Sequence, residues 1–453
     1  MKKLIALLLA VVMVMGLAAC GSKTTTETKA PTEAKVDTPA TEAETDAPAA
    51  AGSVYYLNFK PEFDQALQGL AASYTEKTGV PVKVVTAASG DYSNTLNAQM
   101  GKDGAPTIYN IGNMSGLKDW DEYALDLTGT ALAGELATND FNLYNEAGEL
   151  KAMGYCYESF GIIVNTKLLA DAGHSLDEIK DFASLKAVAD DIHARAAELG
   201  FDAFSSAGLD GSSSWRFSGH LANMPLYYEF RDDGVTEQPA EIKGTYLDNF
   251  RNIWDLYITD SAADPTALST ATGDQSEAEF GEGKAVFYQN GTWEYAALTA
   301  DKFNLNPDEI AMIPIYCGVD GEEKAGLCSG TENCWAINSQ AKEEDIQASL
   351  DFLYWMVTDP DASAVLVEQL GAVPFKNCPA SANKFIVDGN ALLANGNYAV
   401  TWAFNYTPNV DSWRATVVTA LAAYSADPTD ANWEAVKTAF VDGWAIEYKT
   451  VNG

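Results

Sequence analysis

Short apolar runs alternate with helically spaced apolar residues along most of this chain. Residues 54–59 form a run typical of a buried strand, whereas residues 61–78 repeat apolar side chains every three or four positions. Pro61 suits the first turn of that helix, and Gly79 suits its end. The alternation continues with a strand, a helix and a strand at residues 80–86, 92–100 and 107–111. This order predicts an α/β fold with mainly parallel sheets.

The same reading applies to the later part of the chain. Residues 160–164 are predicted as a strand that leads into a helix ending near Gly173, and residues 185–199 as an amphipathic helix. The apolar stripe of residues 346–357 marks a core-facing helix that stops before Pro360. Residues 388–390, Asp-Gly-Asn, have calcium-ligand chemistry but lack the alternating ligands of an EF-hand, so we expect a turn there.

The first twenty residues have the pattern of an export signal. Lys2 and Lys3 precede an apolar run at residues 4–15, which is shorter than the roughly 20 residues of a membrane-spanning helix. Leu-Ala-Ala-Cys at residues 17–20 resembles a bacterial lipobox, in which Cys20 would be acylated. We therefore expect a lipoprotein signal peptide at residues 1–20 and an anchor on the extracytoplasmic face of the cell membrane. The alternative is an ordinary signal peptide with a chance cysteine.

Residues 21–52 differ sharply in composition from the rest of the chain. Thr, Ala, Glu, Lys and Pro dominate, and Val36 is the only large aliphatic residue. Such a segment cannot bury enough apolar surface to offset the entropy of ordering it. We expect a flexible tether, with the folded part beginning near Ser53.

The charge of the chain excludes several classes of partner. The sequence has 28 Lys and Arg against 64 Asp and Glu, a net charge of −36 with His neutral. An anionic surface of this kind repels nucleic acid and anionic lipid. The three His are widely spaced and form no zinc motif, so a His-based zinc enzyme is not expected. We expect no metal and no other cofactor.

The cysteines do not suggest a disulfide framework. Five cysteines remain after Cys20, which is few for a chain of this length. Because five is an odd number, at least one of them stays free. Cys317 and Cys328 flank a turn-rich stretch and could form a bridge. The alternative is that both are buried, reduced thiols.

Polar side chains follow the first strands, where α/β sheets bind their ligands. Lys60 and Glu62 follow the first strand, Asp91 and Tyr92 the second, and Asn113 the third. Ligands of such sheets bind beyond the carboxyl ends of the strands. These five residues are therefore the first candidates for a binding site, although Asp91 could instead cap the helix after it.

Five sequence motifs, in this order, resemble the family 1 extracellular solute-binding proteins of ABC importers, the group that includes the maltose-binding protein. They are TEKTGVPVKVV (75–85), APTIYNIGN (105–113), YESFGIIVNTKLLADAG (157–173), FGEGKAVFYQNGTW (280–293) and GAVPFK (371–376). The resemblance implies two α/β lobes joined by crossover strands, with an oligosaccharide held in the cleft. It implies a first lobe at residues 53–157 and 331–371, and a second lobe at residues 158–330 and 372–453.

The resemblance also suggests individual ligand contacts. Glu158 stands seven residues before Asn165, as the family's carboxylate does, and Trp293 matches an aromatic residue that packs against a sugar ring. Trp413 and Trp215 lie near where the family presents further rings. Asn113 takes the place of an acidic residue of the maltose binder. For each Trp the alternative is a core position, and for Glu158 a salt bridge between crossover strands.

The function implied is capture of a carbohydrate by a monomeric protein and its transfer to an ABC permease, without chemistry on the ligand. Flat rings would cover the apolar faces of a sugar, and carboxylates or amides would bind its hydroxyls. Two other functions stay open at this point: a surface-anchored glycoside hydrolase, which needs two carboxyl groups roughly 5 to 10 Å apart, and a binder of a peptide, polyamine or other non-sugar solute.

Overall fold

The computed structural model describes residues 52–88 and 90–453, which fall within one compact unit. The predicted signal peptide, Cys20 and almost all of the predicted tether lie outside the described residues. Among the described helices, none combines the length and the apolar character needed to cross a bilayer.

The first lobe is built on a six-stranded sheet with the order β2-β1-β3-β11-β5-β4. Its strands are β1 (Val54–Asn58), β2 (Val82–Thr86), β3 (Ile108–Asn110), β4 (Leu143–Tyr144), β5 (Leu150–Gly154) and β11 (Cys334–Ile337). β1 runs parallel to β2 and β3, whereas β11 runs antiparallel to β3 and β5.

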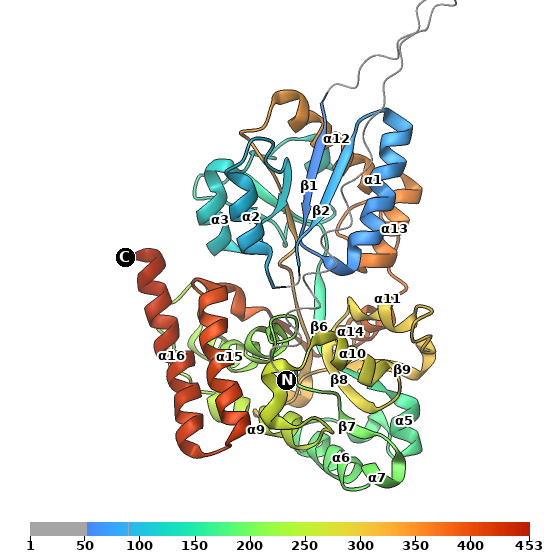
Figure 1. The fold of residues 1–453 in the computed structure, drawn as a ribbon, viewed down its shortest axis with the longest axis vertical. Helices are drawn as coiled ribbons and strands as arrows, with labels where there is room; N and C mark the ends of the chain where they lie inside the picture. The colour runs from blue at the N-terminus through green and yellow to red at the C-terminus, as the bar shows by residue number, and fades with distance from the viewer. Residues whose placement is uncertain (1–51, 89) are drawn as a thin grey trace, which may run out of the picture. The chain divides into compact units, whose positions relative to one another are not determined.

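Helices cover both faces of this sheet. They are η1 (Pro61–Phe63), α1 (Asp64–Thr78), α2 (Tyr92–Met100), α3 (Met114–Trp120), η2 (Asp121–Tyr123), α4 (Ala131–Gly134), α12 (Glu343–Thr358) and α13 (Pro360–Leu370). Neighbouring β1 residues serve different cores: Tyr56 packs with Phe352 of α12, and Leu57 packs with Leu96 of α2. Figure 1 shows α1 and α13 on one side of β1 and β2, with α2 and α3 on the other.

The second lobe contains a sheet with the order β12-β10-β6-β8-β7, in which β9 also pairs with β6. Its strands are β6 (Glu158–Asn165), β7 (Asp202–Phe204), β8 (Ala285–Gly291), β9 (Ile310–Ile313), β10 (Ala325–Gly330) and β12 (Tyr398–Thr401). β6 is antiparallel to β8, β9 and β10, while β7 and β12 are parallel to their neighbours.

The helices of the second lobe surround this sheet (Figure 1). They are α5 (Thr166–Asp171), η3 (Leu176–Glu178), α6 (Phe182–Ala194), α7 (Ala196–Leu199), the π-helical turn η4 (Arg216–Leu221), α8 (Asn223–Asp233), α9 (Leu247–Thr259), η5 (Pro265–Thr270), α10 (Gly273–Gly281), α11 (Glu294–Thr299), η6 (Pro307–Glu309), η7 (Glu322–Lys324), α14 (Lys384–Ala394), η8 (Ala403–Tyr406), α15 (Val410–Ala426) and α16 (Asp430–Asn452).

Both sheets are mixed, so the prediction of mainly parallel sheets was wrong. The chain passes from the first sheet to the second between β5 and β6, and returns between β10 and β11. These two passages run in opposite directions side by side, which brings antiparallel pairs into the middle of each sheet. Strand pairing of this kind depends on residues distant in the sequence, which a local pattern does not reveal.

The crossing segments are hydrogen-bonded to one another. The Tyr155 amide donates to the Asn333 carbonyl at 2.9 Å, and the Thr331 hydroxyl donates to the Cys156 carbonyl at 2.7 Å. A third passage comes after α13, where the Ala372 carbonyl accepts from the Tyr157 amide at 2.9 Å. Three crossing segments of the chain therefore lie together where the lobes join.

The structure differs from the sequence-based expectation at two further places. Residues 388–390 lie inside α14 rather than in a turn, because the Asp388 carboxylate pairs with Lys384 one turn earlier and accepts from the Met312 amide at 3.1 Å. Among the described residues no disulfide forms: Cys317 and Cys328 are both free, buried thiols.

Candidate functional site

A buried lysine joins the two lobes beside the crossing segments. Lys60 lies in the short connection between β1 and η1, where Asn58 hydrogen-bonds both its amide and its carbonyl. Its ammonium nitrogen donates to Oε1 of Glu158 at 2.7 Å and lies 2.7 Å from Oε1 of Glu62. Burial would lower the pKa of Lys60, but the two carboxylates raise it above its usual value. Lys60 is therefore held as a cation.

Glu158 connects this lysine to the crossing segments. It is the first residue of β6, and its second oxygen accepts from Nδ2 of Asn333 at 2.7 Å. Both Lys60 and Glu158 are about 5% exposed. Lys60, Glu62 and Glu158 thus belong to one cluster, in which Glu158 forms a salt bridge, the alternative to a ligand contact. Asn333 was not predicted.

Aromatic rings from separate segments gather next to this cluster. Trp293 follows β8, Trp215 precedes η4, and His220 lies on η4. The ring centroids of Trp215 and Trp293 are 5.9 Å apart, and each lies 5.0 to 5.4 Å from that of His220. The Lys60 ammonium lies 5.8 Å from the Trp293 centroid. Both tryptophans are partly exposed, in contrast to the buried Lys60 and Glu158.

The turn that carries Trp293 is fixed at several points. The Thr292 amide donates to the Ser159 carbonyl at 2.8 Å, and its hydroxyl accepts from the Ser159 amide at 3.2 Å. A Cβ at position 291 would overlap the indole of Trp293, so only glycine allows the ring to lie back over this turn. The local sequence Asn-Gly-Thr-Trp therefore sets the direction of the ring.

The buried ring of His220 is held in its neutral form. Its ring stacks on Phe160 with a centroid distance of 4.0 Å and an angle of 8°. Burial, then Arg414 and Arg216, lower the pKa of His220 well below its usual value. Its Nδ1 is buried and has no hydrogen-bond partner. The π-helical turn that carries it is a rare conformation, found often at functional sites.

A second set of polar side chains, which the sequence did not predict, lies beside the crossing segment at residues 331–333. The Arg414 guanidinium lies 3.8 Å from a Glu332 oxygen and 5.1 Å from the ring centroid of Phe404. Asn405 donates its Nδ2 to the Thr331 carbonyl at 3.1 Å. Burial raises the pKa of Glu332 and Arg414 opposes that rise.

Several atoms of these groups are buried without a hydrogen-bond partner among residues 52–88 and 90–453. They are Nε of Arg414, Oδ1 of Asn333, Oδ1 of Asn405 and Nδ1 of His220. Buried polar atoms in native proteins are nearly always hydrogen-bonded, and a ligand can supply the missing partner. Both acceptors and donors are present, which suits a ligand that carries hydroxyl groups.

Trp413 does not belong to the site, and its predicted role is corrected here. Its side chain is fully buried between α15 and α16, where its indole nitrogen donates to the Phe440 carbonyl at 2.9 Å. Its ring meets Phe440 and Trp444 edge to face. No face of the indole is free to stack on a sugar. The neighbouring Arg414 points toward Glu332 instead.

Asn113 and Tyr92 have structural partners in this fold. Asn113 caps α3 by accepting from the Gly116 amide at 2.9 Å. The Tyr92 hydroxyl accepts from the Asn110 amide at 2.7 Å, and its ring packs edge-on against Phe59. These contacts occupy the Tyr92 hydroxyl and the side-chain oxygen of Asn113.

Asp91 occupies the N-cap position of α2, but its carboxylate makes no bond to the helix backbone. It accepts from Nδ2 of Asn94 at 2.9 Å and remains exposed. The neighbouring Gly90 has a φ of +77°, and a Cβ there would approach the Gly211 carbonyl of the second lobe to 2.7 Å. This loop therefore lies against the second lobe.

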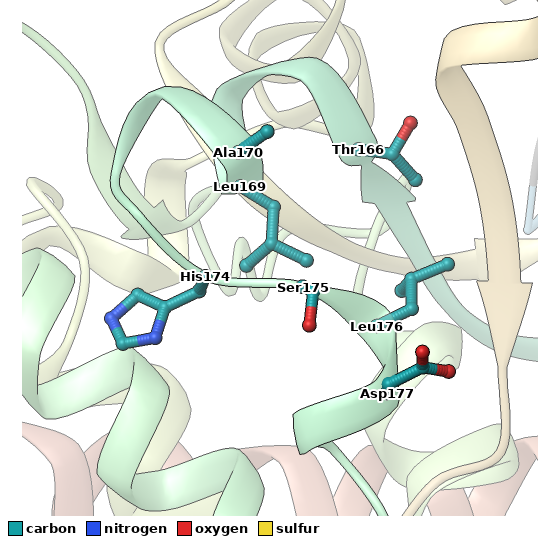
Figure 2. A pocket seen from close by; sticks show the side chains of 7 residues that line it. All are labelled: Thr166, Leu169, Ala170, His174, Ser175, Leu176 and Asp177. Carbon is teal, nitrogen blue, oxygen red and sulfur yellow. The ribbon is translucent and has the colours of Figure 1, made fainter.

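A cavity of about 270 Å³ lies elsewhere, between α5 and η3 (Figure 2). It contains none of the predicted site residues. Its one ring, His174, bonds Glu178 through Nδ1 at 3.0 Å and Asp191 through Nε2 at 2.8 Å. Neither nitrogen is free for a ligand, so the cluster around Lys60 and Trp293 remains the candidate site.

Comparison with models of protein families shows which family the chain belongs to. The model of a family described as bacterial extracellular solute-binding protein matches residues 69–388. The chain belongs to this family. Its members bind solutes rather than transform them, and they work outside the cytoplasm. Membership in the group indicated by the motifs is confirmed. No curated protein matches the chain.

Solved structures confirm the two-lobe α/β fold. The solute-binding protein RafE, solved in complex with raffinose, is 15% identical with a TM-score of 0.70, and covers 88% of this chain and 99% of its own. RafE comes from Streptococcus pneumoniae. The GacH receptor of Streptomyces glaucescens, also solved with acarbose, is 19% identical with a TM-score of 0.64 and the same coverage. A Bacillus licheniformis sugar transporter in complex with stachyose is 15% identical with a TM-score of 0.66, covering 87% of this chain and 100% of its own.

Proposed function

We propose that this protein captures a carbohydrate, most simply a neutral oligosaccharide, between its two lobes and delivers it to an ABC permease. The observation that carries the proposal is the grouping of partly exposed rings, Trp215 and Trp293, beside buried polar atoms that have no partner. Rings cover the apolar faces of sugars, and polar atoms bind their hydroxyls. The raffinose, acarbose and stachyose in the three similar structures are ligands of this kind.

The proposed ligand contacts come from both lobes and from the crossing segments. Trp215 and Trp293 are the proposed ring contacts, as predicted from sequence, and Lys60, Glu62 and Glu158 form the charged cluster beside them. His220, Asn333, Asn405 and Arg414 are added because each has a buried atom without a partner. Asp91 is kept as an exposed contact on the loop that faces Gly211, whereas Tyr92 and Asn113 support the fold around the site.

The mechanism proposed is hinge closure. A ligand that contacts both lobes binds the closed state better than the open state, and thereby shifts the equilibrium toward closure. The three crossing segments are the hinge, because they are the places where the chain passes between the sheets. We propose lobes at residues 53–157 with 331–371, and at 158–330 with 372–453, and the membership of the strands in the two sheets supports this division.

We also propose that the protein is a monomeric lipoprotein. Cys20, behind its export signal, would carry the lipid, and residues 21–52 would tether the folded part to the outer face of the membrane. One lipid chain binds membranes only marginally, so a lipoprotein of this type needs more than one acyl chain. Mass spectrometry of the membrane fraction tests this: an unmodified Cys20 would contradict it.

A thermal-shift screen tests the ligand class. Raffinose, stachyose, maltotetraose, a tripeptide and spermidine would each be added at increasing concentration to the protein from residue 21 onward. A sugar at about 100 times its Kd should stabilise the folded state by about 2.7 kcal/mol and raise Tm by a few degrees. A shift with spermidine or the tripeptide and none with any sugar would overturn the carbohydrate proposal.

The same sugars test whether binding is all that occurs. After prolonged incubation with the protein, chromatography should return each oligosaccharide intact. Release of shorter sugars would show a glycoside hydrolase and contradict the proposal.

A further inference from the structure

One side chain of the third crossing segment, residues 371–383, holds the turn that presents Trp293. Asn383 is the last residue of this segment before α14. Its Nδ2 donates to the Thr292 carbonyl at 2.8 Å, and Thr292 directly precedes Trp293. Its Oδ1 accepts from the Phe385 amide at 2.9 Å and thereby caps α14. One side-chain amide therefore serves both the start of a helix and the turn.

These partners fix which way round the Asn383 side chain lies. Its nitrogen faces a carbonyl, which can only accept, and its oxygen faces a backbone amide, which can only donate. Turning the group over would place two acceptors together at Thr292 and two donors together at Phe385. The backbone amide of Asn383 is also bonded, to the Ser381 hydroxyl at 3.1 Å. The residue is thus held in one orientation.

The same turn is joined to the other two crossing segments. Ser159, which follows the first crossing, accepts from the Thr292 amide at 2.8 Å through its carbonyl, and its own amide donates to the Thr292 hydroxyl at 3.2 Å. The Ser159 hydroxyl lies 2.7 Å from the hydroxyl of Ser329, which precedes the second crossing. Thr292 is therefore bonded, directly or through Ser159, to residues beside all three crossing segments.

Space beside Asn383 leaves room for the turn to shift. A cavity of about 240 Å³ lies there, between α11 of the second lobe and α13 of the first, and its walls include Tyr295, Val367 and Asn383. The Tyr295 amide also donates to the Thr292 carbonyl, but at 3.4 Å this bond is long. The 2.8 Å bond from Asn383 is therefore the stronger restraint on that carbonyl.

We propose that Asn383 is a positioning residue for Trp293: by holding the Thr292 carbonyl, it fixes the direction of the indole relative to the ends of the crossing segments. This inference rests on the proposed function, in which the ring covers the face of a sugar. The link between Asn383 and the ring can be tested without a ligand, so it stands or falls separately. Loss of the donor frees the turn, and the ring then spends less time in the direction that binds.

Two substitutions remove the donor and keep the helix cap. Asn383→Ser and Asn383→Asp both retain an oxygen that can accept from the Phe385 amide, and Asn, Asp and Ser are comparable caps. Neither supplies the bond to Thr292, because the serine side chain is too short and the carboxylate has no proton to donate. Asn306→Ser and Asn306→Asp are the matched controls: Asn306 is an exposed N-cap of the same lobe, which accepts from the Asp308 amide at 3.1 Å.

The first experiment uses tryptophan fluorescence without any sugar. The Trp293 component is the difference between each protein and its counterpart with Trp293→Phe. In both Asn383 variants this component should move to longer wavelength, because a freed ring meets more water, whereas both Asn306 variants should leave it in place. An unmoved component in Asn383→Ser would overturn the proposal. A shift confined to Asn383→Asp would do so too, since it would show an effect of charge alone.

The second experiment measures stachyose affinity by calorimetry, with urea unfolding alongside. Because one hydrogen bond is lost, both Asn383 variants should raise the Kd roughly three- to tenfold, whereas the Asn306 variants should bind like the parent protein. Asn383→Ala also loses the cap, so it should unfold at lower urea than Asn383→Ser while its Kd stays similar to that of Asn383→Ser. Equal Kd values for the parent protein and Asn383→Ser would contradict the positioning role.

The two experiments separate the two proposals. If no sugar binds the parent protein but the Trp293 component shifts as expected, the sugar assignment fails and the positioning role stands. If sugars bind the parent protein and Asn383→Ser equally well, the positioning role fails and the carbohydrate assignment stands.

Discussion

At the scale of single residues, the three tryptophans and one glutamate taken from the family resemblance divide into residues at the candidate site and a residue in a hydrophobic core. Trp293, Trp215 and Glu158 lie near one another, but Trp413 lies in a core between two helices. The local sequence around Trp413 contains no sign of this, because the residues that bury it, Phe440 and Trp444, are some thirty positions later. The helix-capping role of Asn113 is easier to predict from sequence than the burial of Trp413, because an Asn just before a helix is a common N-cap.

Removing the Trp293 ring should weaken sugar binding without weakening the fold. Trp293→Ala should raise the Kd of the best sugar from the screen at least tenfold, a loss of about 1.4 kcal/mol. Calorimetry measures the Kd, and urea unfolding should show stability close to that of the parent protein. Unchanged affinity would remove Trp293 from the site.

Trp413→Ala should lower the stability of the fold and leave sugar affinity unchanged, the opposite of Trp293→Ala. Truncation of a fully buried Trp costs about 3–5 kcal/mol, because it leaves a cavity between α15 and α16. Urea unfolding should show this loss, whereas the Kd of the sugar should change little at a temperature where the protein is folded. A stable variant that no longer binds would reinstate Trp413 as a ligand contact.

At the scale of elements, local signals located the helices and strands well and the partners of the strands poorly. α1 ends at Gly79, whose φ is +77°, as the glycine predicted, and α2 has the predicted bounds Tyr92–Met100. The antiparallel pairing of β6 results from the path of two crossing segments, which depends on contacts between β5, β6, β10 and β11. Asn333 and Arg414 were missed because their significance comes from partners in other segments.

The turn between β8 and α11 offers a test at this scale. Gly291→Ala places a methyl group where the Trp293 indole lies, so the ring must move and sugar affinity should fall about tenfold, by roughly 1.4 kcal/mol. Gly69→Ala is the matched control: Gly69 lies exposed inside α1 with open space around it. It should leave affinity unchanged and stabilise the helix by about 0.5–1 kcal/mol. Equal affinities for the two variants would contradict the role of Gly291.

At the scale of the whole molecule, the net charge of −36 acts on stability as well as on partners. Like charges repel within a compact chain, and salt screens that repulsion, with a Debye length that falls from about 30 Å at 0.01 M to 10 Å at 0.1 M. Raising sodium chloride across this range should therefore raise Tm, as measured by calorimetric scanning. A falling Tm would mean that attractive ion pairs such as Lys60 with Glu158 outweigh the repulsion.

The cysteines have a practical consequence for watching the lobes move. Four of the five described thiols are buried, and the fifth, Cys378, is partly exposed. Among the described cysteines, Cys378 is therefore the one that a maleimide dye would label, and it must be replaced before labelling. A Cys378→Ser background with one engineered thiol on each lobe could therefore carry a fluorophore pair. Energy transfer between the dyes would then report opening and closing of single molecules in real time.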